Sequence, residues 1–296
     1  MGVQLPEVER VVRWAELRQM ARSAEAVGFD SLWVGDHLLY DRPDGIVGPW
    51  EAWSTLAALA ETTSRVEIGP LVAATSFHNP AMLAKKAATV DEISGGRLIL
   101  GLGAGWNEGE YKAYGFPFDR RASRFEEAFT IIRTLLREGR IDFDGEFYQV
   151  RDCVLVPRGP RPEGPPLMIG SIGKRILHYA APYMDAWNAW HDWFGNTPEG
   201  LRPYLAALDE ACRAAGRDPV EIERTATVLV QLTGGKGRPG SIANPTPPVK
   251  GTAQEIAAAI AAYADAGLSH VQLVLDPITV ASIEECAAVL EILDRG

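Results

Sequence analysis

Short apolar, β-branched runs alternate along the chain with longer amphipathic segments. The runs have the length and residue types of strands, and the longer segments repeat their apolar positions at helical spacing. The predicted strands are residues 2–5, 31–34, 66–72, 98–102, 166–170, 185–189, 225–232 and 270–275. The predicted helices are residues 8–27, 50–62, 80–93, 123–137, 174–181, 198–215, 252–266 and 282–293. Strand and helix therefore alternate eight times.

This alternation predicts an α/β fold, specifically a (β/α)8 TIM barrel with insertions. Strands joined through helices form right-handed crossovers in a parallel sheet, and eight such units fit a closed barrel. An open doubly wound sheet is the alternative. Gly28, Gly139, Gly216 and Gly267 follow predicted helices, where a left-handed residue commonly ends the helix. We treat residues 1–296 as a single domain.

Two segments interrupt the alternation. Residues 141–158 alternate in the β manner around Asp144 and Gly145, which predicts an inserted hairpin. Residues 233–251 contain five glycines and four prolines without any period. A loop of that length in a compact protein is usually a functional lid or disordered, and we expect a lid over the bound ligand.

Composition narrows the classes of partner and the compartment. The 296 residues carry 29 Lys plus Arg against 39 Asp plus Glu, a net charge of −10, which disfavours nucleic acid as a partner. The three cysteines form no C-x-x-C pair, as expected in a reducing cytoplasm. No export signal or apolar run long enough for a membrane span is present. We expect a cytoplasmic protein that acts on a small molecule, and a homodimer is compatible with the sequence.

Polar residues just after the predicted strands are candidates for chemistry, because active sites of such barrels lie at the carboxyl ends of the strands. Asp36 and His37 follow the second strand, and an imidazole there can exchange a proton near neutral pH. A loop-capping aspartate beside a surface histidine explains the pair equally well. The five histidines include no H-x-H or H-E-x-x-H pattern, so we expect no metal.

The segment GLGAGWNEGEY, residues 101–111, follows the fourth strand. Its alternate glycines lack the spacing of a dinucleotide fingerprint but would let a flat ligand approach the backbone closely. Trp106 then offers a stacking surface, with Asn107 beside it. A tight turn with a packing tryptophan is the alternative.

The segment LMIGSIGKR, residues 167–175, is a strand that leads directly into a helix. Free amides at a helix start, the Ser171 hydroxyl and the charge of Lys174 suit a phosphate, and Gly170 and Gly173 would let it come close. Many strand-to-helix connections share this pattern, so the signal is weak by itself.

Three tryptophans, Trp187, Trp190 and Trp193, lie within seven residues near the end of the sixth strand. So dense a group either builds core or lines an aromatic cofactor pocket. The sequence leaves both interpretations open.

Together these segments resemble a known family. Residues 24–39, 84–115, 165–175 and 184–190 are similar, in this order, to the bacterial-luciferase-like flavin- and deazaflavin-dependent oxidoreductases. SGGRLILGLGAGW is the most specific of the matching motifs. The resemblance implies a barrel that binds FMN or the deazaflavin coenzyme F420 at the carboxyl ends of its strands.

The resemblance also implies roles for residues. The coenzyme phosphate would bind at Gly170, Ser171 and Gly173, in the turn where the charge of Lys174 already suits a phosphate, and Asp36 and His37 would lie near its reactive ring. A bulge within residues 69–72, often with a non-prolyl cis peptide, would place Leu71 and Val72 behind the ring. Trp106 and Asn107 would shape the substrate side.

We therefore expect an oxidoreductase that uses F420 to transfer a hydride to or from a small organic substrate. A monooxygenase that uses reduced FMN is the first alternative. A barrel isomerase or hydrolase would need paired carboxylates or a lysine at the strand ends, where only Asp36 and Asp276 are found. A non-catalytic coenzyme carrier or sensor is the alternative from another class.

Overall fold

Nine parallel strands form the central sheet and occupy the eight strand positions of a closed barrel. The computed structural model describes residues 1–43, 45–237 and 246–295. The sheet runs in the order β5-β2-β1-β13-β12-β11-β10-β7-β6, and it closes where Ile68 of β5 bridges Leu98 just ahead of β7. The strands are β1 (Gly2–Gln4), β2 (Ser31–Val34), β5 (Glu67–Pro70), β6 (Ala73–Ala74), β7 (Leu100–Gly103), β10 (Leu167–Gly170), β11 (Ala186–Ala189), β12 (Glu223–Gln231) and β13 (His270–Asp276). The predicted (β/α)8 barrel is confirmed.

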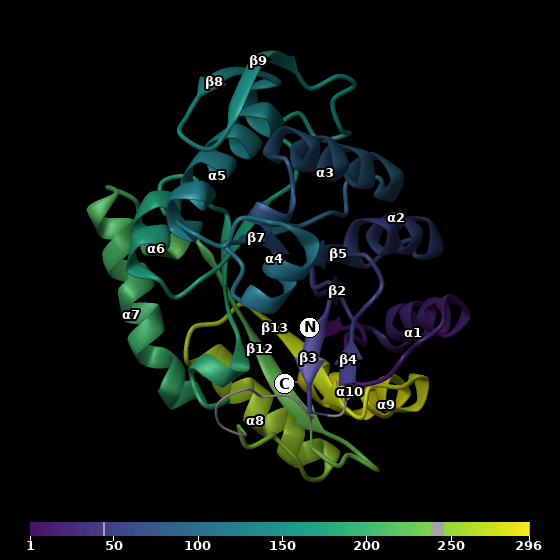
Figure 1. The fold of residues 1–296 in the computed structure, drawn as a ribbon. Helices are drawn as coiled ribbons and strands as arrows, with labels where there is room; N and C mark the ends of the chain where they lie inside the picture. The colour runs from purple at the N-terminus through teal and green to yellow at the C-terminus, as the bar shows by residue number, and fades with distance from the viewer. Residues whose placement is uncertain (44, 238–245, 296) are drawn as a thin grey trace.

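Helices surround this barrel (Figure 1), and most begin and end where the sequence predicts. They are α1 (Trp14–Val27), α2 (Ala52–Thr62), α3 (Pro80–Ser94), α5 (Arg121–Glu138), α6 (Lys174–Ala180), α7 (Pro198–Ala214), α8 (Ala253–Asp265), α9 (Val280–Glu285) and α10 (Ala287–Arg295). Asn79, Thr197 and Thr252 cap helix starts with their side chains. Gly28 and Gly139 end helices in the left-handed conformation, as predicted.

Two predicted helices were wrong in their extent. The first begins at Trp14 instead of residue 8, because Val8, Val11 and Val12 imitate a helical period without forming a buried face: Val11 is 72% exposed. The last is two helices that meet at Cys286.

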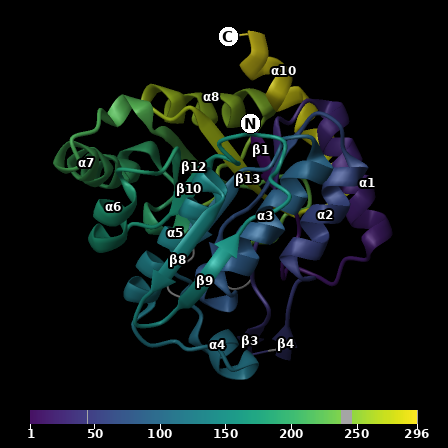
Figure 2. The ribbon, with the colours of Figure 1, turned by 90° about the horizontal axis from the view of Figure 1, so that it is seen from above.

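The insertions lie at two places. Strands β8 (Arg140–Asp144) and β9 (Gln149–Val154) pair antiparallel, in the segment where the sequence predicts a hairpin. A second antiparallel pair, β3 (Tyr40–Arg42) with β4 (Gly45–Val47), and the short helix α4 (Glu108–Tyr114) were not predicted. Figure 2 shows β3, β4 and α4 together beyond one end of the barrel. The described residues also form three 3₁₀ turns: η1 (Thr75–Phe77), η2 (His191–Trp193) and η3 (Pro219–Glu221).

The barrel interior is partly polar. Trp33, Ile99 and Met168 form a small apolar cluster there, separate from the large core between helices and sheet. Beside it, Asn188 donates one amide hydrogen to Thr225 Oγ1 at 2.8 Å and one to Gln272 Oε1 at 2.9 Å. Because each of these side chains is buried, their hydrogen bonds replace water and hold neighbouring strands in register.

The long loop after β12 is described at its two ends, and residues 238–245 lie outside the described part of the chain. Asn196 donates to the Pro247 carbonyl oxygen at 3.0 Å, and Val249 bridges Val230 of β12. The end of this segment is therefore attached to the barrel, and its role as a lid stays a prediction. In the described ranges no helix has the length and apolar character to span a membrane.

Candidate functional site

The most elaborate polar cluster stands at the carboxyl end of β2. His37 Nδ1 lies 2.8 Å from Glu110 Oε1, and the Leu38 amide donates to Glu110 Oε2 at 2.5 Å. The Leu39 amide is 3.4 Å from the same oxygen. Glu110, on α4, is fully buried, and these donors stabilise its charge. One carboxylate therefore fixes both the imidazole and the backbone that carries it.

The other ring nitrogen of His37, Nε2, points to a second carboxylate. Nε2 lies 3.8 Å from Glu7 Oε1, on the segment after β1. Gly35 permits this approach, because a Cβ at position 35 would overlap the Glu7 carboxylate. With Nδ1–H donating to Glu110, Nε2 is the nitrogen left to exchange a proton with a bound molecule.

The pKa of His37 is raised above its ordinary value of 6.5. Burial alone would lower it, but the charges of Glu7, Glu110 and Asp36, together with the hydrogen bond to Glu110, outweigh burial. The imidazole is thus protonated more readily in the folded protein than a free histidine side chain is. His37 can act as a proton donor, with Glu7 beside it.

Aromatic rings flank His37. The centroid of the Tyr40 ring lies 4.7 Å from that of the imidazole, and the Trp106 ring is 5.6 Å away in an edge arrangement. Trp106 is 51% exposed, and the neighbouring Asn107 side chain donates to the Leu39 carbonyl oxygen at 3.0 Å. Trp106 therefore presents an open indole beside the acid–base group, whereas Asn107 ties α4 to the loop after β2.

Asp36 faces another direction. Its Oδ2 accepts the Ala74 amide at 3.0 Å and lies 2.8 Å from His78 Nε2. This carboxylate joins the end of β2 to β6 and the turn after it. These contacts support a structural role for Asp36, in which its carboxylate orients the loop after β2.

The third strand position is divided by a cis peptide bond between Leu71 and Val72, within the segment where the resemblance implied one. The Val72 side chain packs against glycines of two neighbouring strands: a Cβ on Gly103 or Gly170 would come within 2.8 Å of Val72 Cγ2, and one on Gly101 within 2.8 Å of Cγ1. We expected the glycines of residues 101–105 to admit a flat ligand. At two of them the space is taken by Val72.

The turn after β10 lies at the same end of the barrel as His37. The Gly173 amide donates to Ser171 Oγ at 3.1 Å, and α6 begins at Lys174 without a side-chain cap. In the closed ring, β10 is separated from β2 by β7 and by the β5–β6 position. The candidate phosphate turn and His37 therefore lie three strand positions apart on the rim of the barrel.

The tryptophan cluster is mainly core. Trp187 is fully buried and donates to the Ser171 carbonyl oxygen at 2.8 Å, and Trp193 packs on the main core. Trp190 packs against the small cluster inside the barrel. Trp187 thus supports the Ser171 turn from behind.

The buried polar atoms that have no hydrogen-bond partner among the described residues include Gln4 Oε1, at the end of β1, and Thr75 Oγ1, just after β6. Both lie at the same end of the barrel as His37. Unpartnered buried polar groups are costly and often mark a place that a ligand completes. A flavin or deazaflavin ring carries both N–H donors and carbonyl acceptors, so these residues fit such a group.

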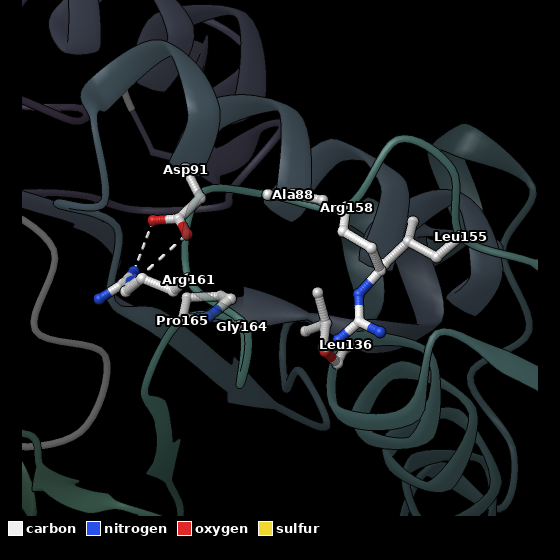
Figure 3. Close-up of a pocket in the computed structure, with 9 residues that line it drawn as sticks. Ala88, Asp91, Leu136, Leu155, Arg158, Arg161, Gly164 and Pro165 are labelled. Atoms are coloured by element: carbon white, nitrogen blue, oxygen red, sulfur yellow. Dashed lines mark hydrogen bonds and ion pairs between the residues drawn. The ribbon is translucent and has the colours of Figure 1, made fainter.

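Two hollows lie away from this end of the barrel. One, between α3, α5 and the segment before β10, is closed by Arg161, which binds Asp91, and has no room for a water molecule (Figure 3). The other lies inside the barrel near His270, at the amino ends of the strands, and measures about 20 Å³. It can hold one water molecule, not a substrate.

Sequence reasoning missed Glu7, Tyr40 and Glu110. Their segments lack a periodic pattern, and the contacts of Glu110 with His37 join residues 73 positions apart. The one available signal was a glutamate in a motif already singled out, GLGAGWNEGEY.

The fold agrees with comparisons to known proteins. The chain matches the family of luciferase-like monooxygenases over residues 2–234 and belongs to it. It is 34% identical over 219 residues to an F420-dependent glucose-6-phosphate dehydrogenase of Amycolatopsis mediterranei, covering 71% of this chain and 63% of that protein. Over 174 residues it is 32% identical to a 5,10-methylenetetrahydromethanopterin reductase of Archaeoglobus fulgidus, covering 59% and 48%. The chain thus matches less than two thirds of the length of these relatives.

Solved structures share the barrel. An F420-dependent secondary alcohol dehydrogenase in complex with an F420–acetone adduct superposes with a TM-score of 0.82 at 21% identity, over 99% of both chains. A monooxygenase from Streptomyces bottropensis superposes at 0.79 and 21%, over 98% of both. At such identities the likeness establishes the fold alone.

Proposed function

We propose that this protein is an oxidoreductase that uses coenzyme F420 to transfer a hydride to or from a small organic substrate. The arrangement of His37 carries the proposal: Glu110 holds Nδ1, and Nε2 stands beside Glu7 at the barrel mouth. F420-dependent enzymes among the relatives support the choice of coenzyme. When bound, F420 supplies the hydride chemistry.

The chain's own residues then bind, orient and exchange a proton. Gly170, Ser171, Gly173 and Lys174 would hold the coenzyme phosphate, and Leu71 with Val72 would support its ring. His37 would give a proton to a carbonyl oxygen, or take one from a hydroxyl, at Nε2. Asp36 would keep the loop after β2 in place.

Trp106 and Asn107 would form the substrate side of the site. The open indole of Trp106 gives a surface for the substrate, and Asn107 keeps that indole next to His37 through its bond to Leu39. The segment at 233–251 would close over the bound ligand.

Replacing His37 tests the catalytic role. His37→Gln should bind F420 with unchanged affinity and lower turnover at least about 100-fold, because general acid–base catalysis typically contributes that much. F420 binding is measured by spectral titration. His178→Gln, at an exposed position on α6, is the matched control. Unchanged turnover in His37→Gln would favour a coenzyme carrier or sensor.

A reduced-FMN monooxygenase is the second candidate, because a solved monooxygenase shares the fold. Titration of the protein with F420 and with FMN, each oxidised and reduced, separates the two. Saturation by FMN alone would reject the F420 proposal.

We also expect the protein in the cytoplasm, because a reducing compartment suits its three free cysteines. A homodimer stays a prediction, which sedimentation of the purified protein would test.

A further inference from the structure

We infer that His78 is a positioning residue of the site. It binds Asp36, and through Asp36 it holds the loop after β2 against the strand segment that would support the coenzyme ring. This inference rests on the proposed function and adds a residue to it. It is carried by the contacts of the buried Asp36 carboxylate and by the place of each partner in the barrel.

The Asp36 carboxylate joins the loop after β2 to the third strand position of the barrel. Its side chain is 3% exposed, and its Oδ2 accepts the Ala74 amide at 3.0 Å and lies 2.8 Å from His78 Nε2. Because a carboxylate only accepts hydrogen bonds, Nε2–H is the donor in this pair. A buried charge is costly without donors, so both contacts favour one position of the carboxylate.

The His78 side chain is itself held by the chain around it. It follows the η1 turn, and its amide donates to the Thr75 carbonyl oxygen at 3.2 Å. Directly after it, Asn79 caps α3 by accepting the Met82 amide at 3.1 Å. The imidazole is 10% exposed and meets the Trp53 ring of α2 edge-on, with ring centroids 6.3 Å apart. His78 therefore presents Nε2 to Asp36 from a fixed backbone.

Ala74 connects the same carboxylate to the segment expected behind the coenzyme ring. Ala74 comes two residues after Val72, whose side chain fills the space beside Gly103 and Gly170. Because so short a stretch of chain separates Val72 from Ala74, displacement of the carboxylate would also displace Val72. We therefore expect the bond between His78 and Asp36 to affect coenzyme binding without touching the coenzyme.

The chain continues from Asp36 directly into His37. His78 lies 2.8 Å from the first of these residues and Glu110 lies 2.8 Å from the second, so the loop after β2 is held by the segment before α3 and by α4. Without His78, the backbone of His37 would lose one of these two attachments. Misplacement of a catalytic group by about 1 Å can cost about 100-fold in rate, so the second attachment matters for a proton donor.

Two polar substitutions that differ in reach test the inference. His78→Gln keeps an amide donor near the place of Nε2, whereas the shorter His78→Asn does not reach Asp36. We expect His78→Asn to raise the Kd for F420 about 10-fold, because a buried carboxylate loses a donor, and His78→Gln to leave it unchanged. The Kd is measured by spectral titration. The NMR signals of the His37 imidazole should move in His78→Asn and stay in place in His78→Gln.

A double-mutant cycle shows whether His78 acts through Asp36. Asp36→Ala removes the acceptor, so adding His78→Asn to that variant should weaken F420 binding no further. Additive losses would mean that His78 acts apart from Asp36, and they would overturn the inference.

His270→Asn is the matched control. Its Nε2 also lies 2.8 Å from a buried partner, Ser31 Oγ, but at the amino end of the barrel. The substitution should lower stability in urea and leave the Kd for F420 unchanged. If His270→Asn weakens F420 binding as much as His78→Asn does, the loss reports stability alone and the inference is wrong.

A measurement on the wild type does not depend on whether the variants fold. Exchange of the Ala74 amide hydrogen requires its bond to Asp36 to open, so F420 should slow this exchange if the bond and the coenzyme stabilise each other. Unchanged exchange with F420 bound, or an unchanged Kd in His78→Asn, would overturn the inference. Failure of the wild type to bind F420 would instead overturn the proposed function.

Discussion

His37 and His270 lie at opposite ends of one barrel, and their pKa values are shifted in opposite directions. His37 follows β2, and its pKa is raised because neighbouring carboxylates outweigh burial. His270 begins β13, and burial, with the nearby N-terminal ammonium, lowers its pKa to about 4. Nε2 of His270 contacts only a hydroxyl, Ser31 Oγ, at 2.8 Å among its hydrogen bonds in the described residues. The direction in which the pKa of a half-buried histidine shifts is thus set by the groups that face it.

The two histidines illustrate that the two ends of the barrel serve different purposes, stability at one end and activity at the other. Residues at the amino ends of barrel strands generally serve stability, and residues at the carboxyl ends serve catalysis. Around His270 the polar groups close the base of the barrel. Around His37 they hold Nδ1 through Glu110 and give Nε2 a longer contact, 3.8 Å, with Glu7.

Removal of the Glu110 carboxylate should cause the largest loss of stability at the end of the barrel that carries His37. Glu110→Ala leaves the amide of Leu38 and the imidazole without their buried acceptor, so we expect a loss of about 3 kcal/mol or more in the free energy of unfolding. Urea unfolding measures the loss. Glu108→Ala, exposed on the same helix, should change stability by less than about 0.5 kcal/mol. Equal stability of both variants would contradict the role of Glu110.

Glu110→Gln sharpens the same point without a cavity. It keeps the shape of the side chain and removes the charge, so the pKa of His37 should fall, which NMR titration of the imidazole would show.

A change of pH should alter the stability contributed by His37 and by His270 in opposite directions. The lowered pKa of His270 means that the unfolded chain binds a proton more readily. Stability from this group is therefore complete above pH 6.5 and falls by up to about 3 kcal/mol as pH drops towards 4. The raised pKa of His37 adds stability that is complete below pH 6.5 and is lost as pH rises through the folded pKa.

Unfolding free energies from pH 4 to 8 check this for the wild type, His270→Gln and His37→Gln. His270→Gln should flatten the acid side of the profile, and His37→Gln should remove the decline on the alkaline side. The same direction of change in both variants would refute the contrast.

Alanine substitutions at two glycines near the proposed coenzyme site should have smaller effects, and the two should differ in how much stability they cost. Gly103→Ala would press on Val72 and cost about 1–3 kcal/mol of stability. At Gly173 an added Cβ meets Ser171 Oγ at 3.5 Å, an ordinary contact, so Gly173→Ala should cost less than about 0.5 kcal/mol. We expect Gly173→Ala to weaken F420 binding nonetheless. Thermal unfolding and titration separate these effects, and a destabilised Gly173→Ala would argue against the distinction.

The barrel was predictable because its strands are buried on both faces and its helices on one face, so that each type of element has its own hydrophobic pattern. Elements that bury no continuous face have no such pattern, and the sequence did not predict them. Of the seven residues of α4 only Glu110 and Tyr111 are buried, and Ile46 of β4 is 71% exposed, so neither segment shows a period.

The site was predictable in part for a similar reason. His37 was identified from its place after a strand. The sequence places Asp36 beside it, but the carboxylate that holds the imidazole is that of Glu110, from a helix after another strand, and Asp36 bonds to His78 instead. Adjacency along the chain reveals little about contacts that cross from one loop to the next, which a single sequence does not record.

The bonds from Asn107 and Glu110 to the loop after β2 have a consequence for engineering. They make the insertion that follows β2 and the insertion that follows β7 a single interlocked unit. A chimera that takes only one of these insertions from a relative would lose the contacts between the two insertions. His37 would then no longer be held in its present orientation. Loop grafts intended to alter specificity should therefore exchange both insertions together.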